Sequence, residues 1–76
     1  MATDFGGKRL ADDAYATCLR CAFDHVAEFG SIRNREIRAI AGIGYDQAIY
    51  FFNRATAEGH FVRKGKASGT HYVRGT

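Results

Sequence analysis

The stretch Asn34–Glu58, NREIRAIA-GIG-YDQAIYFFNRATAE, carries the strongest structural signal in this 76-residue chain. Its apolar residues recur at helical spacing on either side of a glycine turn, which predicts two helices at about residues 34–41 and 45–58. Asn34 is a favoured N-cap residue, so we expect the first of these helices to start there. The turn holds a single isoleucine, Ile43, which we expect to enter the core between the helices.

The same spacing identifies the candidate core. The helix at 45–58 presents two alanines and Phe52 on one face, and we expect Phe52 to lie where all the helices cross. The predicted core residues are Tyr15, Leu19, Ala22, Val26, Ile37, Ile40, Ile43, Ala48, Phe52 and Phe61. One small core of this kind is what a chain of this length can bury.

The chain before this stretch predicts one further helix. Residues 10–29 have helical periodicity, with Asp12 and Asp13 in the first turn, where carboxylates interact favourably with the helix dipole. Gly30 is a typical residue to end such a helix. Residues 1–9 have no periodicity and are predicted to form a mobile arm.

The chain after this stretch changes to a period of two. Residues 60–74 alternate in the manner of strands and are interrupted by the glycine-rich segment Gly65–Gly69, which predicts a β-hairpin with a basic tip. The short piece at 31–33 is a candidate third strand on the edge of this hairpin. The sequence therefore predicts one α+β domain over residues 10–76, with three helices and a C-terminal hairpin.

The charge of the chain is unevenly distributed. Residues 1–30 carry three basic and five acidic side chains, whereas residues 31–76 carry eight basic and three acidic ones. The basic half coincides with the helix pair and the hairpin. A basic surface on one part of a small domain is typical of nucleic-acid binding.

The segment NREIRAIAGIGYDQAIYFFNRATAEGHFVRKGKASGTHYV resembles the winged helix-turn-helix superfamily. The likeness lies in the capped helix, the Gly-Ile turn, the apolar helix ending in Glu-Gly, and the hairpin closing in Gly-Thr-x-Tyr. It covers about residues 31–74. In detail it is similar to the small winged helices of bacterial regulators and of C-terminal modules in larger bacterial proteins.

This resemblance implies binding of double-stranded DNA, by a transcriptional regulator or by the DNA-targeting module of a larger protein. The helix at 45–58 would be the recognition helix in the major groove, and the basic hairpin would be the wing along the phosphate backbone. Gln47 and Tyr50 are expected to carry sequence preference, and Arg54 to position the backbone. The alternative for the first two is that Tyr50 packs against the wing and Gln47 is solvated. The full set of candidate DNA-binding residues is Arg33, Arg35, Arg38, Tyr45, Gln47, Tyr50, Asn53, Arg54, Arg63, Lys64, Lys66 and Ser68.

A different function remains open, which is a protein-interaction or dimerisation module that does not bind DNA. Ile49, Tyr50 and Phe51 would form an apolar patch for that purpose if they were exposed. Even a DNA-binding monomer of this size makes a small footprint, so we expect a homodimer or a fused or associated protein domain as a further partner.

No catalytic constellation is found, and an enzyme is not expected. Cys18 and Cys21 form a C-x-x-C with His25 nearby, but structural zinc needs four ligands and no second cysteine pair exists. We therefore expect Cys18 to be a small buried apolar residue, and no metal or cofactor. The chain has no apolar run long enough to span a membrane, and a cytoplasmic location is expected.

Overall fold

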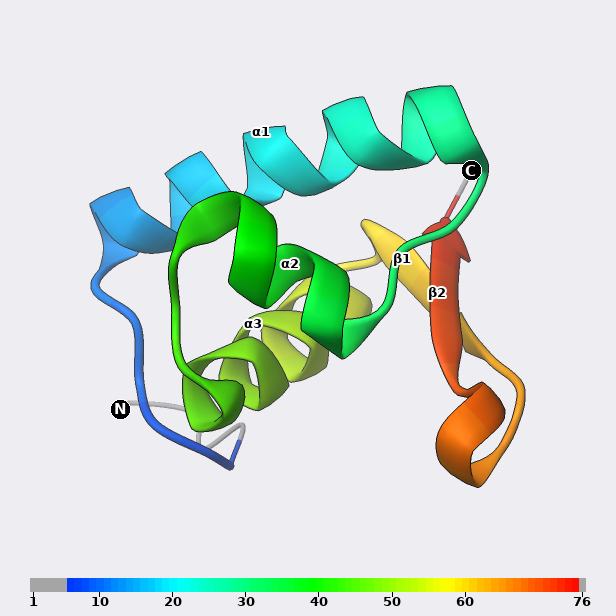
Figure 1. Cartoon of the computed structure of the whole chain (residues 1–76). Coiled ribbons are helices and arrows are strands. Elements are labelled where there is room, and N and C mark those ends of the chain that lie inside the picture. Colours follow the sequence, from blue (N-terminus) through cyan, green and yellow to red (C-terminus); the bar gives the residue numbers. More distant parts are fainter. Residues whose placement is uncertain (1–5, 76) are drawn as a thin grey trace.

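The computed structural model describes residues 6–75, which form three helices followed by a two-stranded antiparallel hairpin (Figure 1). The helices are α1 (Asp12–Phe29), α2 (Asn34–Ala41) and α3 (Tyr45–Ala57). The hairpin joins β1 (Phe61–Lys64) to β2 (His71–Arg74) through a short 3-10 turn, η1 (Ala67–Gly69). This is the predicted α+β layout of a winged helix, with residues 1–5 of the predicted arm outside the described residues.

Helix α1 forms where the sequence predicts but starts two residues later, at Asp12. Leu10 precedes the helix and is nevertheless buried in the core. Gly30 ends the helix in the left-handed conformation, with a φ of 88°, and its N–H donates to the carbonyl of Val26 at 2.7 Å. A residue with a Cβ is strained in that conformation, which explains why glycine stands here.

Helix α2 is capped differently from the prediction. Arg33, not Asn34, is the N-cap residue, and the Glu36 carboxylate accepts the Arg33 backbone N–H at 2.7 Å. Asn34 lies inside the first turn, where its side-chain oxygen accepts a hydrogen bond from Nε of Arg38 at 2.6 Å. A glutamate at the third helical position can take over the role of a polar N-cap side chain, because its carboxylate accepts a backbone N–H at the start of the helix.

The hairpin pairs in register from Phe61 opposite Arg74 to Lys64 opposite His71. The predicted third strand does not form; at its place is a single bridge, in which Ile32 exchanges two backbone hydrogen bonds with Tyr72 at 2.9 and 2.8 Å. Ile32 is fully buried, so this bridge ties the connection between α1 and α2 to the hairpin.

The core is close to the predicted one, but one predicted residue does not belong to it. Ile40 is 43% exposed. Helix α2 faces the core through Ile37 and Ala41, and Ile40 lies to one side of that line. Leu19 and Ile43 are only partly buried.

The aromatic residue at the centre of the core is Phe51, which the predicted core did not include. Phe51 is fully buried, and its ring centroid lies 5.6 Å from that of Tyr15, 5.1 Å from that of Phe52 and 6.4 Å from that of Phe61. Phe51 therefore joins α1, α3 and β1, a position expected for Phe52. Among the described residues, no helix has the length and apolar character needed to cross a membrane.

Candidate nucleic-acid interface

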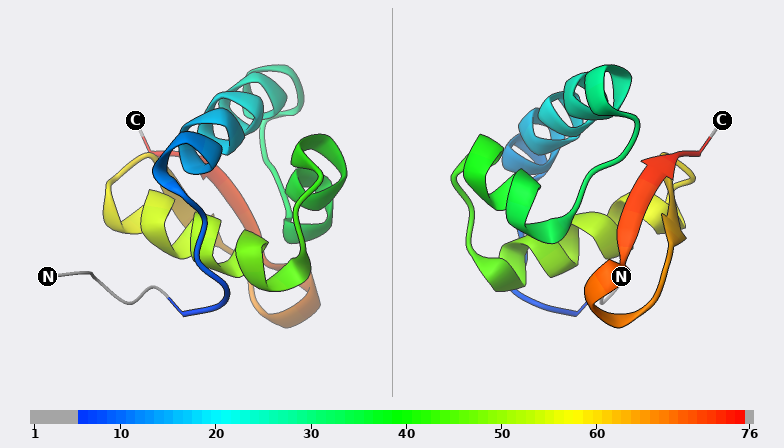
Figure 2. Two further views of the ribbon diagram at one scale, coloured as in Figure 1. Left: turned by 90° about the vertical axis from the view of Figure 1, so that its left-hand side faces the viewer. Right: turned by 45° about the vertical axis from the view of Figure 1, so that its right-hand side comes forward.

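A groove runs between the start of α2, one side of α3 and the inner face of the hairpin. Figure 2 (right) shows α2 and the hairpin on opposite sides of this part of α3. The groove has a volume of about 620 Å³. We call it the basic groove; it is lined by Arg33, Asn34, Arg35, Arg38, Tyr45, Ile49, Phe52, Asn53, Arg63, Ala67, Ser68, Thr70 and Tyr72.

Four arginines from two sides converge on the basic groove. Arg33 and Arg35 come from the start of α2 and Arg38 from its last turn, and Arg63 reaches the groove from β1 on the other side. Within residues 6–75, no aspartate or glutamate lines it. Uncompensated guanidinium groups on two walls create a positive potential between them, which attracts anionic ligands such as phosphate.

The Arg38 side chain is held in place by its neighbours. Its Nε donates to the Asn34 side-chain oxygen at 2.6 Å, and its guanidinium carbon lies 5.4 Å from the centroid of the Tyr45 ring. Tyr45 is 59% exposed. One end of the groove therefore offers an oriented cation beside an accessible aromatic residue.

The alternation of side chains along a strand decides which residues of the hairpin line the basic groove. Arg63 lies opposite Tyr72 in the ladder. It shares a face of β1 with the buried Phe61, because alternate residues of a strand point the same way. The Tyr72 ring stacks on the Phe52 ring, with centroids 3.9 Å apart and planes 4° from parallel. Burial raises the pKa of the Tyr72 phenol, and the positive charge of Arg63 partly offsets this rise.

The two predicted wing lysines lie outside the basic groove. Lys64 follows Arg63 in β1 and so belongs to the opposite face of the hairpin, and Lys66 is exposed in the turn. Gly65 allows the turn to close, because a Cβ there would lie only 2.3 Å from the carbonyl oxygen of Gly69. Ser68, by contrast, does line the groove.

Tyr50 is not on an exposed face, which corrects its predicted place as a base-reading residue. It is 6% exposed, and its hydroxyl oxygen accepts a hydrogen bond from Nη1 of Arg54 at 3.4 Å. Phe51 is fully buried. The apolar patch of Ile49, Tyr50 and Phe51, on which the protein-binding alternative depended, therefore does not exist.

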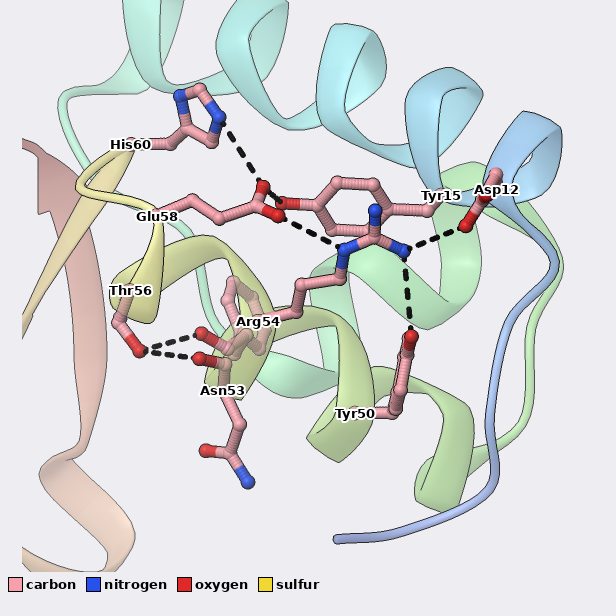
Figure 3. A network of polar contacts seen from close by, with 9 residues as sticks. Asp12, Tyr15, Tyr50, Asn53, Arg54, Thr56, Glu58 and His60 are labelled. Atoms are coloured by element: carbon pink, nitrogen blue, oxygen red, sulfur yellow. Dashed lines mark hydrogen bonds and ion pairs between the residues drawn. The ribbon is translucent and has the colours of Figure 1, made fainter. Parts of the chain in front are cut away.

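Arg54 is likewise directed away from the groove and toward α1 (Figure 3). Its Nε donates to Glu58 at 3.1 Å, and its Nη1 donates to Asp12 at 3.2 Å. The guanidinium carbon lies 3.9 Å from the centroid of the Tyr15 ring. The Arg54 guanidinium, which was predicted to contact the DNA backbone, is therefore engaged by partners within the protein. It connects α3 to α1 instead.

Glu58 completes this network. The Tyr15 hydroxyl donates to Oε1 of Glu58 at 2.6 Å, and Nε2 of His60 lies 3.5 Å from the same oxygen. The hydrogen bond from Tyr15, together with that from Arg54, holds the pKa of the Glu58 carboxyl below its usual range although burial opposes the shift. Burial and the bond to Glu58 both raise the pKa of Tyr15.

Gln47 also has a structural role. Its side-chain oxygen accepts the backbone N–H of Gly44 at 3.0 Å and so caps the start of α3. A bidentate bond to adenine requires both the oxygen and the nitrogen of the amide. Gln47 stands three residues after Gly44, at the third helical position of α3. A glutamine at this position is typical of a capping box, so the capping role could have been recognised from the sequence.

The segment 6–10, which we call the N-terminal strap, lies against one side of α3. It descends from α1 and crosses α3 (Figure 2, left). The Lys8 N–H donates to the carbonyl of Asp46 at 3.1 Å. Gly7 lies so close to α3 that a Cβ would be 2.3 Å from that same oxygen and 3.1 Å from the nitrogen of Tyr50. Residues 6–9 of the predicted arm thus lie against the domain.

The structure brings seven of the twelve predicted site residues together in the basic groove. These are Arg33, Arg35, Arg38, Tyr45, Asn53, Arg63 and Ser68. Ile49, Phe52 and Tyr72 were missed. The spacing of Tyr45, Ile49 and Phe52 at i, i+4 and i+7 marks a shared side of α3, but that side meets the hairpin only through tertiary packing.

The C-x-x-C segment contributes nothing to this site. Cys18 is buried in the core as predicted, and Cys21 is partly buried. Burial raises the pKa of the Cys18 thiol, which keeps it protonated and unreactive. In the part of the chain that the structure describes, no three histidine, cysteine or acidic side chains come together as a metal site.

No protein-family model, no curated protein and no solved structure matches this chain. The winged-helix layout is therefore known from the elements themselves, and membership of the superfamily stays a prediction. The geometry of the basic groove is the available guide to function.

Proposed function

We propose that this protein binds double-stranded DNA through the basic groove and the hairpin wing. The observation that carries the proposal is the convergence of four arginines on one groove without an acidic residue among its described lining. The proposed role is that of a transcriptional regulator or of the DNA-targeting module of a larger protein or complex, in the cytoplasm.

The basic groove suits the sugar-phosphate backbone of one DNA strand. Arg33 and Arg35 stand at the N-terminus of α2, where their guanidinium groups can bind phosphates. Arg63 approaches from the opposite wall, so a strand in the groove would have a guanidinium on each side. Each neutralised phosphate releases counterions, which makes the affinity strongly dependent on salt.

Base contacts in this proposal come from Tyr45 and Asn53, the two predicted α3 residues that line the groove. An asparagine amide can bond the adenine edge, and an aromatic ring can contact a thymine methyl. Gln47 and Tyr50 do not take part, since one caps α3 and the other is buried.

The test is a titration of a mixed-sequence duplex by fluorescence anisotropy over a series of salt concentrations. The double variant Arg35→Ala/Arg63→Ala removes one cation from each wall and is expected to lower the slope of log affinity against log salt by about 2 in magnitude. Arg20→Ala is the matched control, since Arg20 is an exposed arginine on α1. The proposal fails if the wild-type protein binds no duplex at low salt, or if the double variant behaves like the control.

A further inference from the structure

The N-terminal strap limits how α3 can approach a duplex. An α-helix with its side chains is about 10–12 Å across, and the major groove is about 12 Å wide. The strap adds a second layer of chain over Asp46, Ile49 and Tyr50, with Gly7 in direct contact with the helix backbone. While the strap is seated, this side of α3 is thicker than a bare helix, which hinders deep entry into the major groove of a closed duplex, whereas Tyr45 stays exposed on the side of the basic groove.

The basic groove, in contrast, remains open beside the strap. Its volume of about 620 Å³ lies within the range of about 300–1,000 Å³ that is typical of sites enclosing small ligands. The groove can take the backbone of one strand of a duplex at its edge, but both strands of a closed duplex together are too wide to lie inside it. A single strand, with its bases unpaired, is narrow enough to lie along it.

The composition of the groove matches what unpaired DNA requires. Proteins bind single strands by combining a basic channel for the backbone with aromatic rings on which bases stack. Arg35 and Arg63 supply the cations on the two walls. Tyr45 supplies an exposed aromatic side chain, already flanked by the guanidinium of Arg38 at 5.4 Å.

We propose that the basic groove binds a short unpaired stretch of DNA, with one base stacked on Tyr45 and the flanking phosphates held between Arg35 and Arg63. This inference rests on the proposed function, because it names the form of DNA that the same site prefers. The preferred ligand is a duplex that continues into a single strand, with the duplex along the wing and the unpaired segment in the groove.

The experiment compares a blunt duplex, the same duplex with a single-stranded extension, and the isolated strand. The extended duplex should bind about tenfold more tightly than the blunt one, as expected for one well-stacked base. A 2-aminopurine placed in the extension should change its fluorescence on binding, because stacking on an aromatic ring alters its emission.

Variants of Tyr45 identify the stacking ring. Tyr45→Ala should abolish both the tenfold preference and the 2-aminopurine response, and Tyr45→Phe should retain both, because it keeps the ring. Phe29→Ala is the matched control, since Phe29 is a 65% exposed aromatic residue at the end of α1 and outside the groove. Circular dichroism confirms that each variant is folded.

The outcomes separate this inference from the proposed function. One outcome is that the protein binds blunt and extended duplexes equally, and that Tyr45→Ala changes neither the ratio of the two affinities nor the 2-aminopurine emission. The unpaired-strand site is then refuted while duplex binding stands. If none of the three DNAs binds at low salt, both proposals are overturned.

Discussion

At the scale of single residues, two polar side chains that were predicted to contact DNA hold the fold together instead. Arg54 and Gln47 were predicted to contact DNA, but one bonds Asp12 at the start of α1 and the other caps α3. Both bonds are exposed, so each one contributes only modestly to the free energy of unfolding.

The network around Glu58 makes stability depend on pH. The folded protein lowers the pKa of Glu58, so it binds the proton less well than the unfolded chain does. The carboxyl of the unfolded chain titrates at about pH 4.3. The stabilisation is therefore complete above that pH and is lost as the pH falls through the folded pKa.

We expect the urea midpoint to fall between about pH 6 and pH 3 in wild type. In Glu58→Gln it should fall less over the same range, because the amide does not titrate. Parallel curves for the two proteins would mean that Glu58 is not linked to folding.

At the scale of elements, the hairpin divides its charges between two faces. Arg63 faces the basic groove, while Lys64 and Lys66 lie outside it. Neutralising both lysines as Lys64→Ala/Lys66→Ala should weaken binding to all duplexes alike and reduce the salt slope by about 2, one for each phosphate that no longer has a cation beside it. Anisotropy titrations over a salt series measure this slope. An unaltered slope would place the outer face of the hairpin away from the DNA backbone.

The N-terminal strap is fixed to α3 by a contact that only glycine allows. At Gly7 φ is 65°, and a Cβ would meet the Asp46 carbonyl at 2.3 Å. Gly7→Ala should therefore detach the strap and break the bond from the Lys8 N–H to Asp46. Hydrogen exchange at the Lys8 amide, followed by NMR, should become faster.

The neighbouring Gly6 provides the control for this experiment. A Cβ at Gly6 would approach only the Asn53 side-chain nitrogen, at an ordinary 3.8 Å. Because φ is also positive there, Gly6→Ala shares the backbone strain but not the clash. Equal exchange rates in wild type and Gly7→Ala would show that the strap is not held at this point.

At the scale of the whole molecule, one small aromatic cluster holds the elements together. Phe51 contacts the rings of Tyr15, Phe52 and Phe61, which come from α1, α3 and β1. Phe51→Ala should cost about 3–5 kcal/mol, a large part of the stability of so small a domain. Chemical denaturation measures this loss.

The exposed Phe29 is the control for the core substitution. Phe29 is 65% exposed. Phe29→Ala should therefore change the free energy of unfolding by no more than about 0.5 kcal/mol. If Phe51→Ala unfolds at nearly the wild-type denaturant concentration, Phe51 is not the residue that joins the three elements.

The basic groove is the other property of the whole molecule. The seven predicted residues in it come from parts of the chain 35 positions apart, Arg33 to Ser68. The sequence indicated that these residues are mostly basic or polar and that they lie in the positively charged half. It did not indicate which of them face one another, because that depends on how α2 and the hairpin dock on α3.

The elements themselves could be predicted from the sequence. Glycines at 30, 42 and 59 adopt positive φ at or just after the helix ends. The periods of 3.6 and 2 predict the helices and the hairpin nearly at their observed bounds. These are local properties, because capping and periodicity depend on residues a few positions apart.

The accessible side chains of α3, in contrast, could be identified only in the folded chain. By periodicity Tyr50 belongs to the outer face, yet it is buried, with the strap against the α3 backbone at this position and Arg54 turned back toward α1 beside it. The strap is far from Tyr50 in sequence, and its docking depends on contacts such as the one between Gly7 and the Asp46 carbonyl. Burial by a distant segment leaves no periodic pattern, so it could not be predicted from the sequence.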